Sequence, residues 1–131
     1  MERTAVNPWQ WSLSMGFNQG EVVTGASRIL FLAGQASVDA DGAVVHAGDM
    51  AGQVTQAVDN MEAVLNDAGM SLANVVRLNI FTTDVDLLFE HYGNLASRTG
   101  AAGVAPPGTL VGVTRLAYPE LMVELEATAV A

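Results

Sequence analysis

The sequence predicts an α+β domain in two layers, and three observations lead to that expectation. The expected elements follow one another as strand, strand, helix, strand, helix, strand, strand, an order that puts two helices on one face of a mixed sheet. The 131 residues are enough for one hydrophobic core and too few for two ordinary domains. Half of the residues are hydrophobic. We therefore expect a single domain, residues 1–131, with part of its apolar surface against another subunit.

The N-terminal part is expected to begin without regular structure. Residues 1–19 carry Trp9, Trp11 and Phe17, which either fill an edge of the core or cover a neighbouring subunit. Two short strands, at 21–24 and 28–33, then flank the turn TGAS. Apolar side chains stand on both faces of the second strand, so we expect that strand to be buried from both sides.

The stretch VDADGAVV predicts a turn, because Asp39, Asp41 and Gly42 are turn-forming residues between apolar ones. A calcium loop of the EF-hand type would need oxygen ligands at positions where this chain has Ala43 and Val45. We therefore expect a hairpin turn here and no calcium site.

Two helices are expected. The first covers 49–68, with Asp49 capping its start and Gly69 its end. Its apolar residues recur at helical spacing: Met50, Val54, Ala57, Val58, Met61, Leu65 and Ala68. The second covers about 85–98 and leads into the loop TGAAGVAPPG. That loop has neither lysine nor phosphate-binding spacing, so we assign it no nucleotide-binding role.

Strands complete the pattern. Residues 74–83 are expected to form a strand whose side chains alternate between the core face and the opposite face. The core face carries Val76, Leu78 and Ile80, and the opposite face carries Val75, Arg77, Asn79 and Phe81. The stretch PPGTLVGV predicts extended backbone that enters a short apolar strand. The last strand is expected to alternate in the same way. Its core face carries Leu121, Val123, Leu125, Ala127 and Ala129. Its other face mixes apolar and polar side chains: Met122, Glu124, Glu126, Thr128 and Val130. The second face of the sheet would stay exposed in one subunit, and a closed cyclic oligomer would cover it.

Composition excludes several function classes. The formal net charge is −9, there is no lysine, and the five arginines are widely spaced, which disfavours binding to nucleic acid. Cysteine is absent, so thiol chemistry and disulfides are excluded. No apolar run approaches the roughly 20 residues that cross a bilayer, and the first residues lack the pattern of a signal peptide. We therefore expect a cytoplasmic protein without a membrane partner.

The sequence lacks the motifs that would bind a metal ion or an organic cofactor. His46 and His91 lie far apart without a third ligand at a useful spacing, so we expect no metal site. Dinucleotide, P-loop and serine-hydrolase motifs are missing. Proton transfer and water activation remain, and Glu124 and Glu126 are the candidates for them. These glutamates either lie in a partly apolar cleft or stand solvated on an open strand; the residues alone leave both open.

Four stretches carry a resemblance to a known family. They are AGQAS, AVDNMEAVLNDAGM, VVRLNIFTTDVD and TLVGVTRLAYPELMVELEATAVA, in order from about Phe17 to Val130. Together they resemble the YjgF/RidA family of reactive intermediate deaminases. The resemblance implies a chorismate-mutase-like α+β fold and a homotrimer with small-molecule clefts between subunits. It also implies hydrolysis of reactive enamines and imines without metal or organic cofactor.

The resemblance assigns roles to single residues of this chain. The water-positioning glutamate corresponds to Glu124, and the glycine that donates a backbone hydrogen bond corresponds to Gly34. The arginine that grips a substrate carboxylate in deaminating members corresponds to Gly108, which has no side chain. A tyrosine common near the first strand corresponds to Phe17, which lacks the hydroxyl. The cleft and one carboxylate are thus expected to remain, and the carboxylate clamp is expected to be lost.

Two hypotheses follow. In the first, the protein is a cofactor-free hydrolase or deaminase whose substrate is held without that clamp, by Thr109, by backbone amides near Gly108, or by Arg115 or Arg77. Glu124 would orient water toward the carbon of a C=N bond. In the second, the trimer binds or senses a small molecule without chemistry. Under either hypothesis imines derived from amino acids, such as 2-iminobutyrate, are expected to be poor substrates.

Overall fold

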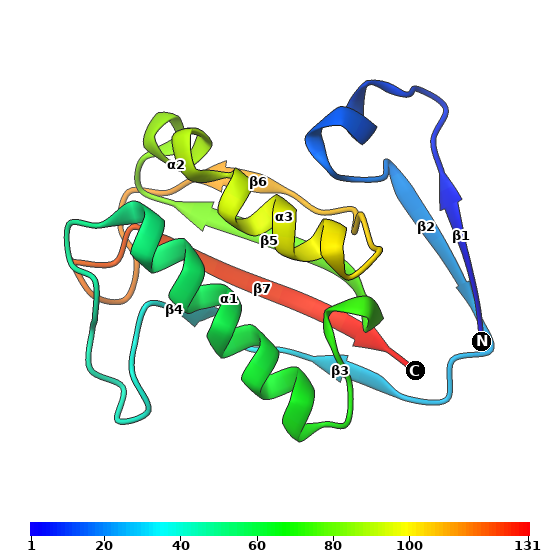
Figure 1. The fold of residues 1–131 in the computed structure, drawn as a ribbon, viewed down its shortest axis with the longest axis horizontal. Coiled ribbons are helices and arrows are strands. Elements are labelled where there is room, and N and C mark those ends of the chain that lie inside the picture. Colours follow the sequence, from blue (N-terminus) through cyan, green and yellow to red (C-terminus); the bar gives the residue numbers. More distant parts are fainter.

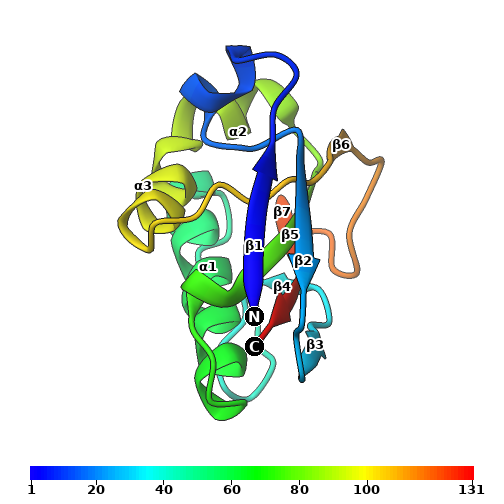
Figure 2. The same cartoon turned by 90° about the vertical axis from the view of Figure 1, so that its right-hand side faces the viewer.

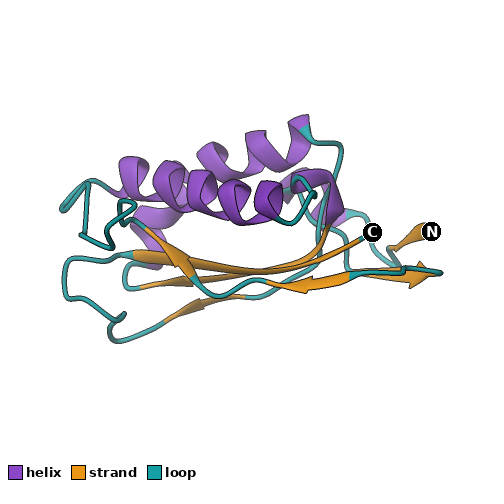
Figure 3. Ribbon diagram, turned by 90° about the horizontal axis from the view of Figure 1, so that it is seen from below, coloured by secondary structure: helices purple, strands orange, loops and turns teal.

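The protein is a five-stranded mixed sheet with three α-helices on one face (Figures 1 and 3). The computed structural model describes all residues, 1–131. The strand order is β3-β7-β5-β6, and β4 also pairs with β7. All pairs are antiparallel except β5 with β6. The strands are β3 (Ile29–Phe31), β4 (Gln35–Ala36), β5 (Val75–Thr82), β6 (Leu110–Gly112) and β7 (Val123–Val130).

Helix α1 (Met50–Asp67) supplies most of the core, as its periodicity predicted. Its buried stripe packs on β7, and burying each large apolar side chain stabilises the fold by about 1.5–3 kcal/mol. The Asp49 side chain accepts a hydrogen bond from the N–H of Gly52 at 3.0 Å, which caps the start. Gly69, at φ +72°, ends the helix in the left-handed conformation that glycine adopts without strain. The predicted boundaries of this helix are confirmed to within one residue.

Strand β7 has the predicted alternation. The core face of β7 is buried beneath α1, whereas Glu124, Glu126 and Thr128 on the other face are half-buried. The buried residues are Val123, Leu125, Ala127 and Ala129. Because the helices all lie on one side, the carboxylate face is the one that no helix covers (Figure 3).

Strand β5 departs from the predicted alternation at its start. Val75 was expected beside Arg77, away from the core, but it is buried within the core cluster. The pairing register with β7 shifts between Val75 and Arg77. A bulge adds one residue, and one residue reverses the face to which the preceding side chain points. From Leu78 onward the predicted alternation is confirmed.

The second predicted helix is two helices, so the prediction of two helices in total is wrong. α2 (Val85–His91) ends at Tyr92, and α3 (Gly93–Ala101) follows directly. The Tyr92 N–H donates to the carbonyl of Phe89, three residues back, which tightens the last turn. Gly93 comes next, and glycine has low helix propensity. The break turns Phe89 and Tyr92 into an edge-to-face pair with ring centroids 6.3 Å apart.

The prediction of an irregular segment over 1–19 is also wrong. Strand β1 (Glu2–Val6) pairs with β2 (Gly20–Thr24) in a separate two-stranded sheet, and a short 3-10 helix, η1 (Trp11–Met15), lies in the connection. Strand β2 was expected to flank a turn with β3, but its partner is β1. Figures 1 and 2 show this hairpin beside the main body, with both termini close together.

Arg3 attaches the hairpin to the body. Its guanidinium pairs with Glu21 of β2 and donates to the carbonyls of Ala73 and Val75, the latter at 2.9 Å. A second short 3-10 helix, η2 (Leu72–Asn74), precedes β5 at this point. Most other side chains of the hairpin are exposed or half-buried. Arg3 and the hydrogen bond from the Asn18 N–H to the carbonyl of Ala105, at 2.8 Å, thus both tie this segment to the body.

Strand β3 was expected to be buried from both sides, which is wrong for the single chain. Leu32 just beyond it is buried, but the side chains of Ile29 and Phe31 are 60% and 77% exposed. They lie on the face without helices. The turn predicted at Asp39 is confirmed: its carboxylate accepts from the N–H groups of Asp41 and Ala43 at 2.9 and 3.0 Å.

None of the helices combines the length and the apolar character that a membrane span requires.

Candidate functional site

Glu124 and Gly34 meet on the uncovered face of the sheet, which we call the open face. Glu124 stands in β7 between the buried Val123 and Leu125, so its side chain points away from the helices. A Cβ atom on Gly34 would lie 1.9 Å from Oε1 of Glu124. The carboxylate therefore lies directly against the backbone of Gly34, and glycine alone leaves it this space.

The backbone of Gly34 offers a hydrogen-bond donor beside that carboxylate. Gly34 lies between β3 and β4, where the ladder with β7 is interrupted: Leu32 donates to the carbonyl of Ala127 at 3.0 Å, and pairing resumes at Gln35 with Leu125. The exposed Gly34 N–H donates to no other group of the chain. A carboxylate acceptor next to an open N–H donor can hold a water molecule and a polar substrate atom together.

The second glutamate of β7 has a different role. The Glu126 carboxylate accepts from the side-chain amide of Asn79 at 2.9 Å, and the Asn79 oxygen accepts from the backbone N–H of Thr109 at 3.1 Å. These bonds connect β7, β5 and the chain that leads into β6. Glu126 is thus engaged in the sheet, whereas the Glu124 carboxylate makes no hydrogen bond to the chain.

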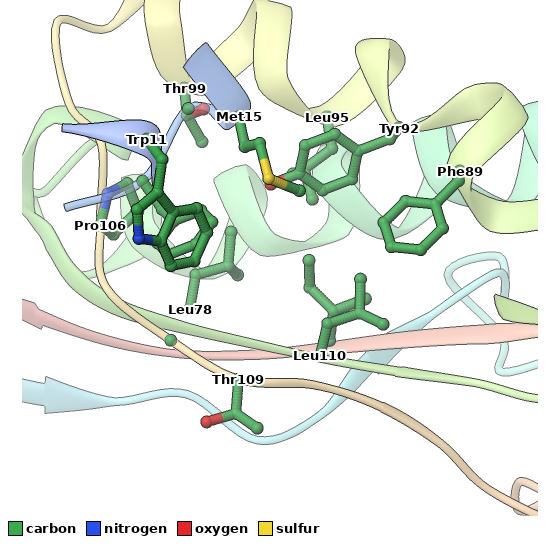
Figure 4. Close-up of a pocket in the computed structure, with 14 residues that line it drawn as sticks. Trp11, Met15, Leu78, Phe89, Tyr92, Leu95, Thr99, Pro106, Thr109 and Leu110 are labelled. Carbon is green, nitrogen blue, oxygen red and sulfur yellow. The ribbon is translucent and has the colours of Figure 1, made fainter. Parts of the chain in front are cut away.

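Phe17 and Gly108 lie elsewhere, at a pocket on the helix side of the sheet. The pocket has a volume of about 290 Å³ and lies between η1, the α2–α3 pair and the β5–β6 edge (Figure 4). Leu78 and Ile80 of β5 line it, and these are core-facing residues of the strand. Thr109 contributes to the rim, but its side chain points away from the pocket (Figure 4).

The backbone at Gly108 excludes any side chain. A Cβ atom there would lie 1.6 Å from the carbonyl oxygen of Leu78 and 2.6 Å from the carbonyl carbon. Hydrogen bonds on both sides of Gly108 hold its backbone close to β5. The Leu78 N–H donates to the carbonyl of Pro107 at 3.1 Å, and the Ile80 N–H donates to the carbonyl of Thr109 at 2.8 Å. The position assigned to the clamp arginine is therefore a point of close contact between backbones, and an arginine would require the chain to move.

The two other arginines considered as replacements are not beside Glu124. Arg115 lies in the exposed connection between β6 and β7 and approaches only the carbonyl of Ala117, at 3.5 Å. Arg77 is on the open face but pairs with Thr128, four residues along β7 from Glu124, or roughly 13 Å at strand spacing. In the single chain the predicted site residues thus lie in three places: Glu124 with Gly34 on the open face, Phe17, Gly108 and Thr109 at the pocket, and Arg115 in the exposed connection.

The pocket and the open face also differ in charge. No lysine, arginine, aspartate or glutamate lines the apolar pocket. Its ionisable group is Tyr92, and burial raises the pKa of that phenol above its ordinary value of 10.0. No group of three histidine, aspartate or glutamate side chains in the chain could hold a metal ion.

Most residues of the pocket were not predicted from the sequence. Met15, Phe89, Tyr92 and Leu95 line it together with Phe17, and they come from segments far apart along the chain. Phe89 and Tyr92 are three residues apart, a spacing that places two side chains on one helix face. This spacing in the sequence indicates a shared helix face, but it does not indicate which segment packs opposite that face.

Comparisons with known proteins agree with the fold. The family model described as Endoribonuclease L-PSP matches residues 13–131. The RutC family protein YjgH of Escherichia coli is 31% identical over 117 residues, 89% of this chain and 88% of that protein. The crystal structure of YyfB from Yersinia pestis, a Rid family protein of unknown function, has a TM-score of 0.86 and 32% identity over all of both chains. That of the Escherichia coli YjgF gene product has a TM-score of 0.69 and 27% identity over 87% of each chain.

The family model covers the open face, Gly34, Glu124 and the whole apolar pocket except Trp11. The resemblance inferred from the four sequence stretches is thereby confirmed. The chain belongs to the Endoribonuclease L-PSP family, the family of the YjgF and RidA proteins.

Proposed function

We propose that this protein hydrolyses small imines or enamines that carry no carboxylate, without a cofactor, at the site formed by Glu124 and Gly34. The observation that carries the proposal is the position of the Glu124 carboxylate against the Gly34 backbone, with the Gly34 N–H open beside it. A carboxylate without a partner in the chain is available to accept a proton, which is the role of a general base.

The chemistry balances with these two groups. The substrate reacts as the protonated imine. Glu124 takes a proton from water as the water oxygen forms a bond to the carbon of C=N and the π electrons pass to the nitrogen, which gives a neutral carbinolamine. The Gly34 N–H donates to a polar atom of the substrate and orients it. Glu124 gives its proton to the amine nitrogen and then accepts the hydroxyl proton as the C=O bond forms and the C–N bond breaks, so that a ketone and ammonia leave and the last proton passes to ammonia.

Substrate preference follows from charge. Glu124 and Glu126 both stand on the open face, and neither forms an ion pair with an arginine. A substrate carboxylate would meet like charge without a guanidinium to pair with it, and a charge-assisted hydrogen bond of that kind contributes about 1.5–3 kcal/mol. The lost clamp therefore favours substrates without a carboxylate over those derived from amino acids.

The site would be completed by further copies of the chain in a homotrimer. Exposed apolar side chains on the open face support this part of the proposal, with Phe31 of β3 the most exposed and Val111 of β6 also exposed. Large apolar side chains left exposed at the two edges of a sheet face are typical of an association surface. Glu124 would then lie in a cleft between subunits instead of on an open surface.

RNA cleavage, the activity in the name of the family model, fits this chain poorly. The net charge is −9, and three of the five arginines are used within the chain. These are Arg3, Arg28 and Arg98, which bind Glu21 and backbone carbonyls, the carbonyl of Ala68, and the acidic pair Asp59 and Glu62. A phosphate backbone would find no cluster of cations.

A second candidate function is binding or sensing without chemistry. The apolar pocket favours it, because that pocket has room for a ligand and no carboxylate, imidazole or amine to transfer protons. Turnover separates the two candidates, since a binder would retain its ligand unchanged.

Glu124→Gln is the test, with Glu126→Gln as the matched control on the same strand face. The substrate is the N–H imine of 2-butanone, generated from sec-butylamine by an amine oxidase, and ammonia release is followed above the spontaneous rate. Glu124→Gln is expected to lower the catalysed rate at least about 100-fold, the usual contribution of a general base. Glu126→Gln keeps an oxygen acceptor for Asn79 and is expected to retain most activity. Equal rates for wild type and Glu124→Gln would refute the proposal.

A further inference from the structure

We infer that Gln53 and Asn60 of α1 are positioning residues for the site of Glu124 and Gly34, because their side-chain amides fix the backbones of the two strands that meet there, β7 and β4. The catalytic part of this inference rests on the proposed function, whereas the placement of Glu124 is tested without any substrate. Neither amide makes a hydrogen bond to the Glu124 carboxylate, so both act through the backbone.

Glu124 lies where the sheet has little other support. It is the second residue of β7, and the connection that leads to it is mostly exposed over residues 113–120. Its neighbour β4 has only two residues, of which Ala36 pairs with Glu124. Strand ends beside exposed connections open more readily than strand centres. The carboxylate therefore keeps its place only if the backbone is fixed at both strands.

Gln53 fixes the start of β7. Its side chain is fully buried, and its oxygen accepts from the N–H of Met122, the residue before the strand, at 2.8 Å. Its nitrogen donates to the carbonyls of Glu120 and His46 at 2.9 and 3.2 Å. Every polar group of this side chain thus bonds to backbone, and the first turn of α1 is connected to the chain that enters β7.

The residue before β7 is held at both of its backbone polar groups. Besides the bond from its N–H to Gln53, Met122 accepts at its carbonyl from the Thr82 hydroxyl at 2.7 Å and from the Thr83 N–H at 3.1 Å. The Thr82 side chain is also fully buried. Glu124 follows two residues later, so the direction in which its side chain leaves the sheet depends on this anchor.

Asn60 fixes β4 from the same side of α1. It lies seven residues after Gln53, or about two helical turns. Its nitrogen donates to the carbonyls of Ala36 and Val38, both at 2.9 Å, and its oxygen accepts from the Gln56 side chain at 2.9 Å. Figure 1 shows α1 crossing over the start of β7 and over β4. One helix thus holds both strands of the site.

The use of amides at these positions favours a positioning role. A buried amide lowers stability unless its polar groups are hydrogen-bonded, and apart from Gln53 the buried residues of α1 are aliphatic, alanine or methionine. Hydrogen bonds are directional, and a fully bonded buried network specifies one arrangement of the backbone. A general base needs such a fixed arrangement, because a displacement of about 1 Å can lower a catalysed rate about 100-fold.

Gln53→Met tests the anchor of β7, with Asn74→Ala as the matched control at the opposite end of the strand. Methionine keeps the length of the side chain and removes its amide. Asn74 donates to the carbonyl of Val130 at 2.9 Å, roughly 20 Å along β7 from Glu124. With the 2-butanone imine, Gln53→Met is expected to lower kcat at least about tenfold and to keep KM within about twofold, because proton transfer is impaired and substrate binding is not. Asn74→Ala should keep kcat within about twofold of wild type.

Asn60→Ala tests the anchor of β4, and it replaces Gln53→Met should that variant fail to fold. Alanine is a strong helix former at this half-buried position, and the substitution removes the bonds to Ala36 and Val38. The same loss of kcat at unchanged KM is expected. All rates are measured well below the melting temperature of each variant, so that global unfolding does not contribute.

Hydrogen–deuterium exchange followed by mass spectrometry gives a measurement without substrate. Gln53→Met should speed exchange of the backbone amides of residues 121–125 at least about tenfold and leave residues 127–131 unchanged, whereas Asn74→Ala should do the reverse. Asn60→Ala should speed exchange over residues 34–38. A role in overall stability alone would speed exchange equally along β7. If Glu124→Gln hydrolyses the imine as fast as wild type, the proposed function fails, and these exchange rates alone decide whether the two amides hold Glu124.

Three results would overturn the inference. The first is wild-type kcat in Gln53→Met and Asn60→Ala while Glu124→Gln is impaired. The second is a loss of kcat in Asn74→Ala as large as that in Gln53→Met, which would indicate that any weakening of β7 has the same effect. The third is unchanged exchange of residues 121–125 in Gln53→Met and of residues 34–38 in Asn60→Ala.

Discussion

The two faces of the sheet are made by the same strands and carry opposite kinds of surface. On the helix side, β5 and β7 present buried aliphatic residues, and an uncharged pocket lies between the β5–β6 edge, η1 and the α2–α3 pair. On the open face, the alternate residues of the same strands present Glu124, Glu126 and Asn79. Strand alternation thus separates a place suited to apolar binding from one suited to proton transfer by the thickness of a single sheet.

Two glycines mark this contrast, and the same substitution is expected to have different consequences at each. At Gly34 a new Cβ meets the end of a flexible side chain, the Glu124 carboxylate; at Gly108 it meets the backbone carbonyl of Leu78. A carboxylate can rotate away, whereas a paired strand cannot. Changing Gly34 should therefore affect activity, and changing Gly108 should affect stability.

Gly34→Ala is expected to have the largest effect. Displacing the Glu124 carboxylate should lower imine hydrolysis about 100-fold, the scale of a lost general base. The melting temperature should change little, because only a side-chain end has to move. Steady-state rates and thermal unfolding on the same preparation measure both. Full activity in Gly34→Ala would show that the contact between Gly34 and Glu124 has no catalytic importance.

Gly108→Ala should lower the free energy of unfolding by about 2–3 kcal/mol, the cost of overpacking against a structure that cannot yield. Urea unfolding at one fixed protein concentration measures the loss. Gly103→Ala, whose Cβ would meet no atom but whose φ is +75°, is the control for backbone conformation alone. A smaller loss at Gly108 than at Gly103 would mean that the β5–β6 edge adapts to a side chain.

Phe31→Glu tests whether the open face is an association surface. The substitution places a charge on the most exposed large apolar side chain of that face and should reduce the particle mass measured by light scattering to that of a single chain. Phe89→Glu makes the same change on the helix side and should leave the mass unaltered. An unchanged particle mass for Phe31→Glu would show that the chains do not associate through the open face.

Tyr92→Phe should have the smallest effect, visible only at high pH. The unfolded chain releases the phenolic proton near pH 10.0, while burial raises the pKa in the folded state. The folded state therefore binds more protons above pH 10, and stability is constant below that pH and falls as pH rises through the folded pKa. Tyr92→Phe should flatten this fall in urea titrations. Parallel curves for the two proteins would contradict a buried Tyr92.

The features that the sequence predicted correctly are those determined within one continuous segment of the chain. Helix α1 and strand β7 were predicted because their burial repeats along one segment, residue after residue. The position of Val75 was not, because a bulge reverses the alternation without changing composition. The partner of β2 was not predicted either: strand patterns describe faces, and the hairpin with β1 is a choice between distant segments.

The candidate site divides in the same way. Glu124 and Gly34 were assigned by family resemblance, and the structure brings them together. Phe17 and Gly108 lie across the sheet from them in the single chain, at a pocket assembled from four segments, and their place in a cleft between subunits stays a prediction. The Gly108 backbone contact has no sequence signature beyond the glycine itself, because it depends on how closely β6 approaches β5.

The most direct test of the central claim compares two imines that differ in one group. 2-Iminobutyrate and the imine of 2-butanone share every atom of the reacting centre, and a carboxylate in the first stands where the second has a methyl group. The lost clamp predicts that kcat/KM for the 2-butanone imine is at least about tenfold higher, since the carboxylate gains no charge-assisted hydrogen bond. Faster hydrolysis of 2-iminobutyrate, abolished by Glu124→Gln, would contradict it and assign this chain the carboxylate-dependent deaminase activity that Gly108 argues against.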